Sequence, residues 1–86
     1  MNKYKQTPEY ILDLHGKTCA ETKAELLRLL REEKYRHVRI ITGKGTFREK
    51  GGVLRDFVKT FLCQNAVRFL PSKIEDGGDG ALEVFF

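Results

Sequence analysis

The stretch Leu12-Asp13-Leu14-His15-Gly16 predicts a β-strand that ends at a glycine turn. Side chains alternate between the two faces of a strand, so Leu12 and Leu14 are expected on one face and Asp13 and His15 on the other. The carboxylate and the imidazole would then lie within reach of each other at the strand end. Histidine titrates nearest to neutral pH, and a neighbouring carboxylate can orient its ring and stabilise its charged form. This pair is therefore the chain's best candidate for proton transfer.

Length and composition predict one folded domain with a basic N-terminal half. The 86 residues fit a single core, and 41% hydrophobic residues is ordinary for a globular protein. The net charge of +4 is unevenly spread: residues 1–50 hold twelve Lys and Arg against seven Asp and Glu, whereas residues 51–86 hold four against five. A basic half suits a polyanionic partner, although a modest net charge is a weak signal by itself.

The remaining composition argues against zinc, disulfides and membranes. Cys19 and Cys63 belong to no CxxC motif or Cys/His cluster, so we expect two free thiols and no metal ligands. The chain has no apolar run long enough to span a bilayer, and its start lacks the apolar core of a signal peptide. We therefore expect a cytoplasmic monomer, with residues 1–8 as a flexible leader and residues 9–86 as the domain.

The first strand, Glu9–His15, is followed by a helix with a clear start signal. Thr18 and Glu21 have the spacing of a capping box, and the helix is expected to end near Lys34. The apolar periodicity places one set of residues on the core face and three basic residues outward. The core set is Ala20, Ala24, Leu27 and Leu30, widened by Leu26 and Leu29, and the outward set is Lys23, Arg28 and Arg31.

A second strand is expected at His37–Thr42, where Val38 and Ile40 alternate with more exposed neighbours. Two strands separated by one amphipathic helix form a βαβ unit, so these strands should be parallel. Parallel strands end at the same edge of a sheet, which is the usual location of sites in open α/β folds. Asp13 and His15 should therefore emerge beside Thr42 and the glycine-rich loop that follows it.

The loop Gly43–Gly52 is a candidate phosphate cradle. Gly43 and Gly45 flank Lys44 and would let the backbone approach a ligand, while Arg48 and Lys50 add positive charge. The spacing of a Walker loop is absent. The composition leaves a second interpretation open, in which the glycines only serve turns in a solvated connection.

The rest of the chain predicts a helix and two strands, giving the order β-α-β-α-β-β. The helix Val53–Gln64 carries an apolar stripe that indicates core packing. The stripe consists of Leu54, Phe57, Val58, Phe61 and Leu62. Strands are expected at Val67–Leu70 and at Ala81–Phe86, with Glu83 and Phe85 facing away from Leu82 and Val84. The acidic, glycine-rich segment Pro71–Gly80 is interpreted as a turn and not as a metal site.

From about Tyr10 to Phe86, the chain resembles the small MutS-related (Smr) domain family. The resemblance rests on an ordered set of motifs that are individually weak. These are Leu12-Asp13-Leu14-His15-Gly16, Gly43-Lys44-Gly45, Gly52-Val53-Leu54 and Gly77-Gly78-Asp79-Gly80-Ala81-Leu82-Glu83-Val84. The resemblance implies a two-layer α/β sandwich similar to the C-terminal domain of translation initiation factor three, in agreement with the order of elements.

The resemblance also implies work on nucleic acid, and several Smr domains are similar to endonucleases that nick DNA or cleave RNA. It assigns catalysis to Asp13 and His15, and phosphate binding to Gly43, Lys44 and Gly45, with Arg48 and Lys50 beside them. No metal need be bound by the protein alone, although phosphates and waters could complete a Mg²⁺ shell. One departure is Thr42, which stands where many members carry a histidine. The alternative is a non-catalytic module that binds RNA, DNA or a ribosome.

Overall fold

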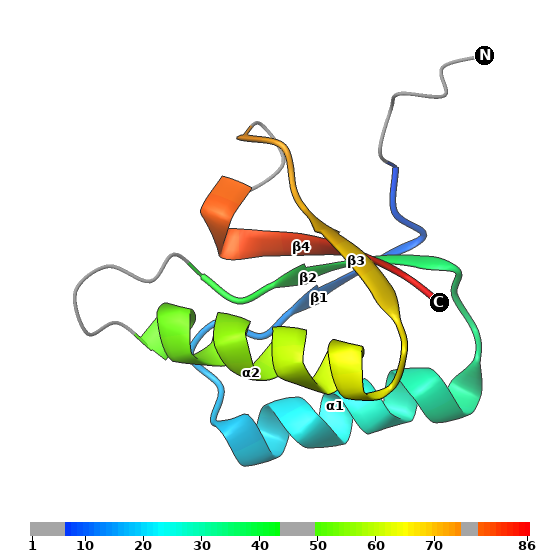
Figure 1. The fold of residues 1–86 in the computed structure, drawn as a ribbon, viewed down its shortest axis with the longest axis horizontal. Coiled ribbons are helices and arrows are strands. Elements are labelled where there is room, and N and C mark those ends of the chain that lie inside the picture. The colour runs from blue at the N-terminus through cyan, green and yellow to red at the C-terminus, as the bar shows by residue number, and fades with distance from the viewer. Residues whose placement is uncertain (1–6, 44–49, 75–77) are drawn as a thin grey trace.

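The computed structural model describes residues 7–43, 50–74 and 78–86, which form a four-stranded sheet with two helices (Figure 1). The elements are β1 (Tyr10–Asp13), α1 (Cys19–Glu32), β2 (His37–Ile41), α2 (Lys50–Gln64), β3 (Arg68–Pro71), the short 3₁₀ turn η2 (Gly78–Gly80) and β4 (Ala81–Phe85). The predicted order of helices and strands and the α/β class are confirmed. Neither helix in these described ranges is long and apolar enough to cross a membrane.

The sheet is mixed, with strand order β1-β2-β4-β3. β1 and β2 are parallel, as the βαβ pattern predicts, with a register from Tyr10 opposite Val38 to Asp13 opposite Ile41. β4 lies between β2 and β3 and is antiparallel to both. Pro71, which cannot donate a backbone hydrogen bond, lies in an edge strand, where a donor can be missing.

Both helices cover the same face of the sheet and run in the same direction (Figure 1). The core lies between the sheet and the two helices and contains aliphatic side chains from both. Its fully buried members include Leu14, Leu26, Val38, Ile40, Val58, Leu62, Leu82 and Val84. The stripe predicted for α2 is confirmed, since Leu54, Val58, Phe61 and Leu62 are buried and Phe57 is half-buried. Among the residues described, no helix covers the other face of the sheet. We call this the open face.

The start of α1 is confirmed, and its predicted core face is right for Leu26, Leu29 and Leu30 but wrong for Ala20, Ala24 and Leu27. Thr18 caps the helix and exchanges both hydrogen bonds of the capping box with Glu21. The face turned to the core carries Thr22, Leu26 and Leu29, whereas Leu27 is 41% exposed. Ala20 and Ala24 are exposed as well. The leucines of this helix fall on two overlapping stripes, and the sequence pattern favoured the one without the polar Thr22.

Most element boundaries differ from the sequence prediction by one to three residues: α2 begins at Lys50 and not at Val53, and β2 and β4 each end one residue early. At three further boundaries the structure gives a local reason. β1 ends at Asp13 because the Leu14 carbonyl accepts a hydrogen bond from the Lys17 amide, which closes a turn. α1 ends at Glu32, since Glu33 takes a left-handed conformation with φ of 50°. β3 begins one residue late because the Val67 amide donates back to the end of α2.

Glu83 lies on the open face of β4, as predicted, but it is fully buried. Its carboxylate accepts hydrogen bonds from Ser72 Oγ (2.5 Å), Arg39 Nε (2.7 Å) and His37 Nε2 (2.5 Å). The His37 ring stacks on Phe85 at 4.7 Å between ring centroids. Side-chain alternation identified the face but not the burial, because the covering groups come from β2 and from the residue after β3.

Glu83 holds a charge that its neighbours stabilise. Burial by itself raises the pKa of Glu83, but hydrogen bonds from Ser72, Arg39 and His37 outweigh burial, and the pKa lies below its usual value of 4.5. A carboxyl whose pKa is lowered by folding contributes stability above its unfolded pKa, and that stability is lost as the pH falls through the folded pKa.

We predict that Glu83→Gln lowers the free energy of unfolding at neutral pH by about 3 kcal/mol, because removing the carboxylate breaks the buried ion pair of Glu83 with Arg39. Chemical denaturation measures this value. The difference from wild type should shrink as the pH falls below the usual carboxyl pKa. Glu32→Gln, on the exposed side of α1, is the matched control and should change stability by less than about 0.5 kcal/mol. Equal stability of the Glu83 variant and wild type at neutral pH would contradict the prediction.

Candidate functional site

The chain turns sharply after β1, and Gly16 makes the turn. The Lys17 amide donates to the Leu14 carbonyl at 3.0 Å, and Gly16 has a φ of +80°. A four-residue turn with φ near +80° at its third residue is of type II, which favours glycine at that place. His15 therefore occupies the second position of the turn, where its side chain projects from the end of the strand.

Asp13 and His15 form the side-chain pair that the sequence predicted. His15 Nδ1 lies 2.5 Å from Asp13 Oδ1, and the same oxygen accepts a hydrogen bond from the His15 amide at 3.1 Å. The side chains are 50% and 69% exposed, respectively, so a substrate in solution can reach both. When the carboxylate accepts a hydrogen bond from the Nδ1–H of a neutral imidazole, the lone pair of the ring is on Nε2. The pair is arranged as an accessible general base with an orienting carboxylate.

The carboxyl of Asp13 stays ionised at neutral pH. The hydrogen bond to the His15 side chain, followed by the one to its amide, holds the pKa of Asp13 below its usual value of 3.8. The positive charge of Lys17 acts in the same direction. Lys17 was not among the predicted site residues, although its place directly after Gly16, two residues from the imidazole, was a signal in the sequence.

The end of β2 lies beside this pair, as the parallel arrangement predicts. The Leu14 amide donates to the Ile41 carbonyl at 2.7 Å, which ties the two strand ends together. Gly43 follows with a φ of +87°, a conformation that favours glycine. The structure thus places Gly43 at the same edge as Asp13 and His15.

Thr42, which departs from the histidine that many Smr domains carry at this place, has a fully buried side chain. The amides of Thr42 and Gly43 both donate to the Gly80 carbonyl, at 2.8 and 3.0 Å, and the Thr42 hydroxyl lies 3.4 Å from the same oxygen. Gly80 was not predicted as a site residue. It anchors the start of the glycine loop through the backbone, which no side-chain pattern reveals.

The remaining predicted phosphate ligands are not placed by the structure. Lys44, Gly45 and Arg48 lie outside the described residues, and of Lys50 only its position as the first residue of α2 is described. His37 is at the opposite end of β2 from Thr42 and is bonded to Glu83, so it cannot take the place of a second imidazole at this edge. Both cysteines are free, as predicted.

No group of three or more His, Cys, Asp and Glu side chains that could hold a metal ion occurs within residues 7–43, 50–74 and 78–86. Asp13 is the carboxylate of the candidate site in these ranges, and one carboxylate with phosphates and waters is a common way to hold Mg²⁺.

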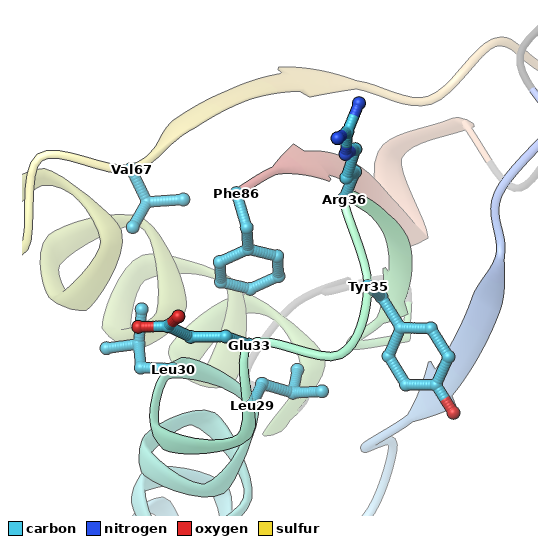
Figure 2. A pocket seen from close by; sticks show the side chains of 7 residues that line it. All are labelled: Leu29, Leu30, Glu33, Tyr35, Arg36, Val67 and Phe86. Atoms are coloured by element: carbon cyan, nitrogen blue, oxygen red, sulfur yellow. The ribbon is translucent and has the colours of Figure 1, made fainter.

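A pocket of about 330 Å³ lies at the opposite edge of the sheet (Figure 2). Its walls are Leu29, Leu30, Glu33, Tyr35, Arg36, Val67 and Phe86. Figure 2 shows the Phe86 ring pointing toward Leu29 and Leu30, while the Arg36 side chain points away from them. Asp13 and His15 are not among its lining residues, so it is not the place for their chemistry.

Comparison with known proteins identifies one family. Residues 12–86 match the Smr domain family. The Smr domain of Thermus thermophilus MutS2 has a TM-score of 0.74 at 30% identity, covering 88% of this chain and 95% of that one. The human small MutS-related domain has a TM-score of 0.66 at 28% identity, covering 88% and 99%. YdaL, a stand-alone small MutS-related protein from Escherichia coli, shares the fold at 24% identity, with a TM-score of 0.73 and coverage of 91% and 67%. No curated protein matches the sequence.

We predict that Gly16→Ala destabilises the domain by about 1 kcal/mol, because an L-residue in a left-handed conformation costs roughly this amount. No atom outside the neighbouring residues lies within 4 Å of an added Cβ, so the loss would be conformational and not steric. Gly16→Asn is the matched control, since asparagine adopts this conformation more readily and should cost less. Thermal or chemical denaturation distinguishes the variants, and equal losses for Ala and Asn would contradict a conformational cause.

Proposed function

Because the chain belongs to the Smr domain family, whose members are in general nucleic-acid-binding modules, we propose that it binds nucleic acid and cleaves it as an endonuclease. The substrate is RNA or a nicked or structured DNA. The observation that carries the proposal is the contact of 2.5 Å between His15 Nδ1 and Asp13 Oδ1 on an exposed strand end. We place this activity in the cytoplasm.

His15 acts as the general base in this proposal. Nε2 takes the proton from the attacking oxygen, which is a 2′-hydroxyl in RNA or a water molecule, while Asp13 fixes the ring and stabilises the imidazolium that forms. The low pKa of Asp13 keeps the carboxylate charged throughout the neutral range, so it can stabilise that cation. The same imidazolium can afterwards return the proton to the leaving oxygen.

The scissile phosphate is held by backbone and cationic groups at the same edge. Gly43, Lys44 and Gly45 supply amides and a charge in the proposal, and Arg48 and Lys50 add positive charge. Gly80 supports this role indirectly, because its carbonyl anchors the backbone at Gly43. Lys17, whose charge lowers the pKa of Asp13, is a further cation near the reacting phosphate.

The buried side chain of Thr42 favours a second function, in which the domain binds RNA, DNA or a ribosome without cleaving it. A threonine that is fully buried and hydrogen-bonded to a backbone carbonyl offers no second acid for the leaving oxygen. Under this alternative, affinity for nucleic acid would be salt-dependent and independent of His15.

Cleavage of labelled RNA and of supercoiled and duplex DNA tests the proposal. We expect His15→Ala to lower the cleavage rate roughly 10²- to 10⁴-fold, the usual contribution of a general base, with affinity retained. His37→Gln is the control, since it replaces the other histidine at the far end of β2 with an amide that can still donate to Glu83. Reactions with Mg²⁺ and with EDTA report on the metal. Binding without cleavage above the His15→Ala background would leave the binding module as the function.

A further inference from the structure

A small slot opens between the starts of the two helices, next to the candidate site. It is lined by Lys17, Thr18 and Cys19 from the start of α1 and by Val53 and Leu54 from the first turns of α2. Its volume is about 170 Å³. Both helices begin at the edge where β1 and β2 end (Figure 1), so the slot lies at the edge that carries Asp13 and His15. We call it the interhelix slot.

We propose that the interhelix slot binds an unpaired nucleobase next to the scissile phosphate, so that the substrate is a single-stranded or unpaired segment of nucleic acid. This inference rests on the proposed function and specifies its substrate class. The evidence for it is the shape and chemistry of the slot together with its position beside the catalytic pair.

The walls of the slot suit a flat, weakly polar ring. Leu54 is buried at 1% exposure, whereas Val53 is 61% exposed, so one wall of the slot is accessible to a ligand. Cys19 is half-buried between them and Thr18. A cavity of roughly 150 Å³ with aliphatic and aromatic walls can hold a benzene-sized ring. The interhelix slot therefore has room for a pyrimidine ring or for part of a purine.

The polar groups of the slot favour a nucleotide over a free anion. The Thr18 amide and the Glu21 amide are already bonded within the capping box, so these two donors are not available to an anion. The Thr18 hydroxyl accepts one of those bonds and keeps its own proton, which it can donate to a base edge. Lys17 is the cation of the slot, and its charge adds to the hydrogen bonds that lower the pKa of Asp13.

These groups together fit one nucleotide whose phosphate and base are held separately. Lys17 would contact the phosphate backbone, and Val53, Leu54 and Cys19 would contact the base. A base that is paired and stacked in a duplex cannot enter a slot between two helices without leaving the stack, and that costs a few kcal/mol. The slot therefore selects against intact duplex.

The test compares two probes on the full chain carrying His15→Ala, which keeps the probes intact. One is a short single-stranded RNA, and the other is a phosphodiester of the same length in which every base is missing. Fluorescence anisotropy should show that the protein binds the base-containing probe roughly tenfold more tightly, as burial of a ring's apolar surface suggests. It should also bind this probe more tightly than the corresponding duplex.

Val53→Ser removes one wall of the slot at an exposed position. We expect it to weaken binding of the base-containing probe about fivefold and to leave the abasic probe unchanged, because only the first loses a contact. Leu27→Ser, at an exposed position in the middle of α1, is the matched control and should change neither affinity. Lys17→Gln should weaken binding of both probes similarly and reduce the salt dependence of binding by about one ion, whereas Lys34→Gln, two residues after α1, should not.

The possible outcomes separate the two proposals. The base-binding proposal would be wrong if the protein bound the base-containing and abasic probes with equal affinity. It would also be wrong if Val53→Ser weakened binding of both probes equally. Either result would leave the proposed nucleic-acid binding intact. Binding of duplex as tightly as of the single strand would also overturn the base-binding proposal. Failure of the protein to bind any probe would refute the proposed function and the slot together.

Discussion

The parallel pairing of β1 with β2 is the constraint on which the rest of the structure depends. A parallel pair requires a crossover helix, and α1 supplies it on the face that becomes the core. Because both strands end at one edge, the residues after them meet there, and both helices begin there as well. The glycines with positive φ at that edge, Gly16 and Gly43, turn the chain away from two adjacent strand ends. The acid–base pair and the glycine loop are neighbours for this reason.

The open face has a second organising interaction, centred on the buried carboxylate of Glu83. This group joins Arg39 and His37 of β2 to Ser72, the residue after β3, across the central strand β4. Directly before β4, the Gly80 carbonyl accepts hydrogen bonds from the amides of Thr42 and Gly43. The end of β2 is therefore hydrogen-bonded on both sides, to the Gly80 carbonyl before β4 and to the Leu14 amide after β1. A charge buried in this way stabilises the fold only while all its partners are present.

The pair of Asp13 and His15 differs from this buried cluster in how much tertiary structure it needs. Asp13 and His15 are two residues apart, and their contact requires only a strand end and a turn. What the fold adds is their surroundings: the neighbouring strand end at Gly43, the charge of Lys17 and the interhelix slot. An exposed pair of this kind contributes little to stability, so substitutions there can test chemistry without disturbing the core.

The sequence by itself determined the elements, the parallel βαβ unit and the Asp13–His15 pair, because each depends on spacing along a strand or helix. It also carried the motifs of the Smr family. It could not choose between two overlapping leucine stripes on α1, since both have helical period and only packing into the core selects Thr22, Leu26 and Leu29. Tertiary structure alone decided the burial of Glu83, the anchoring role of Gly80 and the slot at Val53. Each of these depends on contacts between residues far apart in the chain, which no local period encodes.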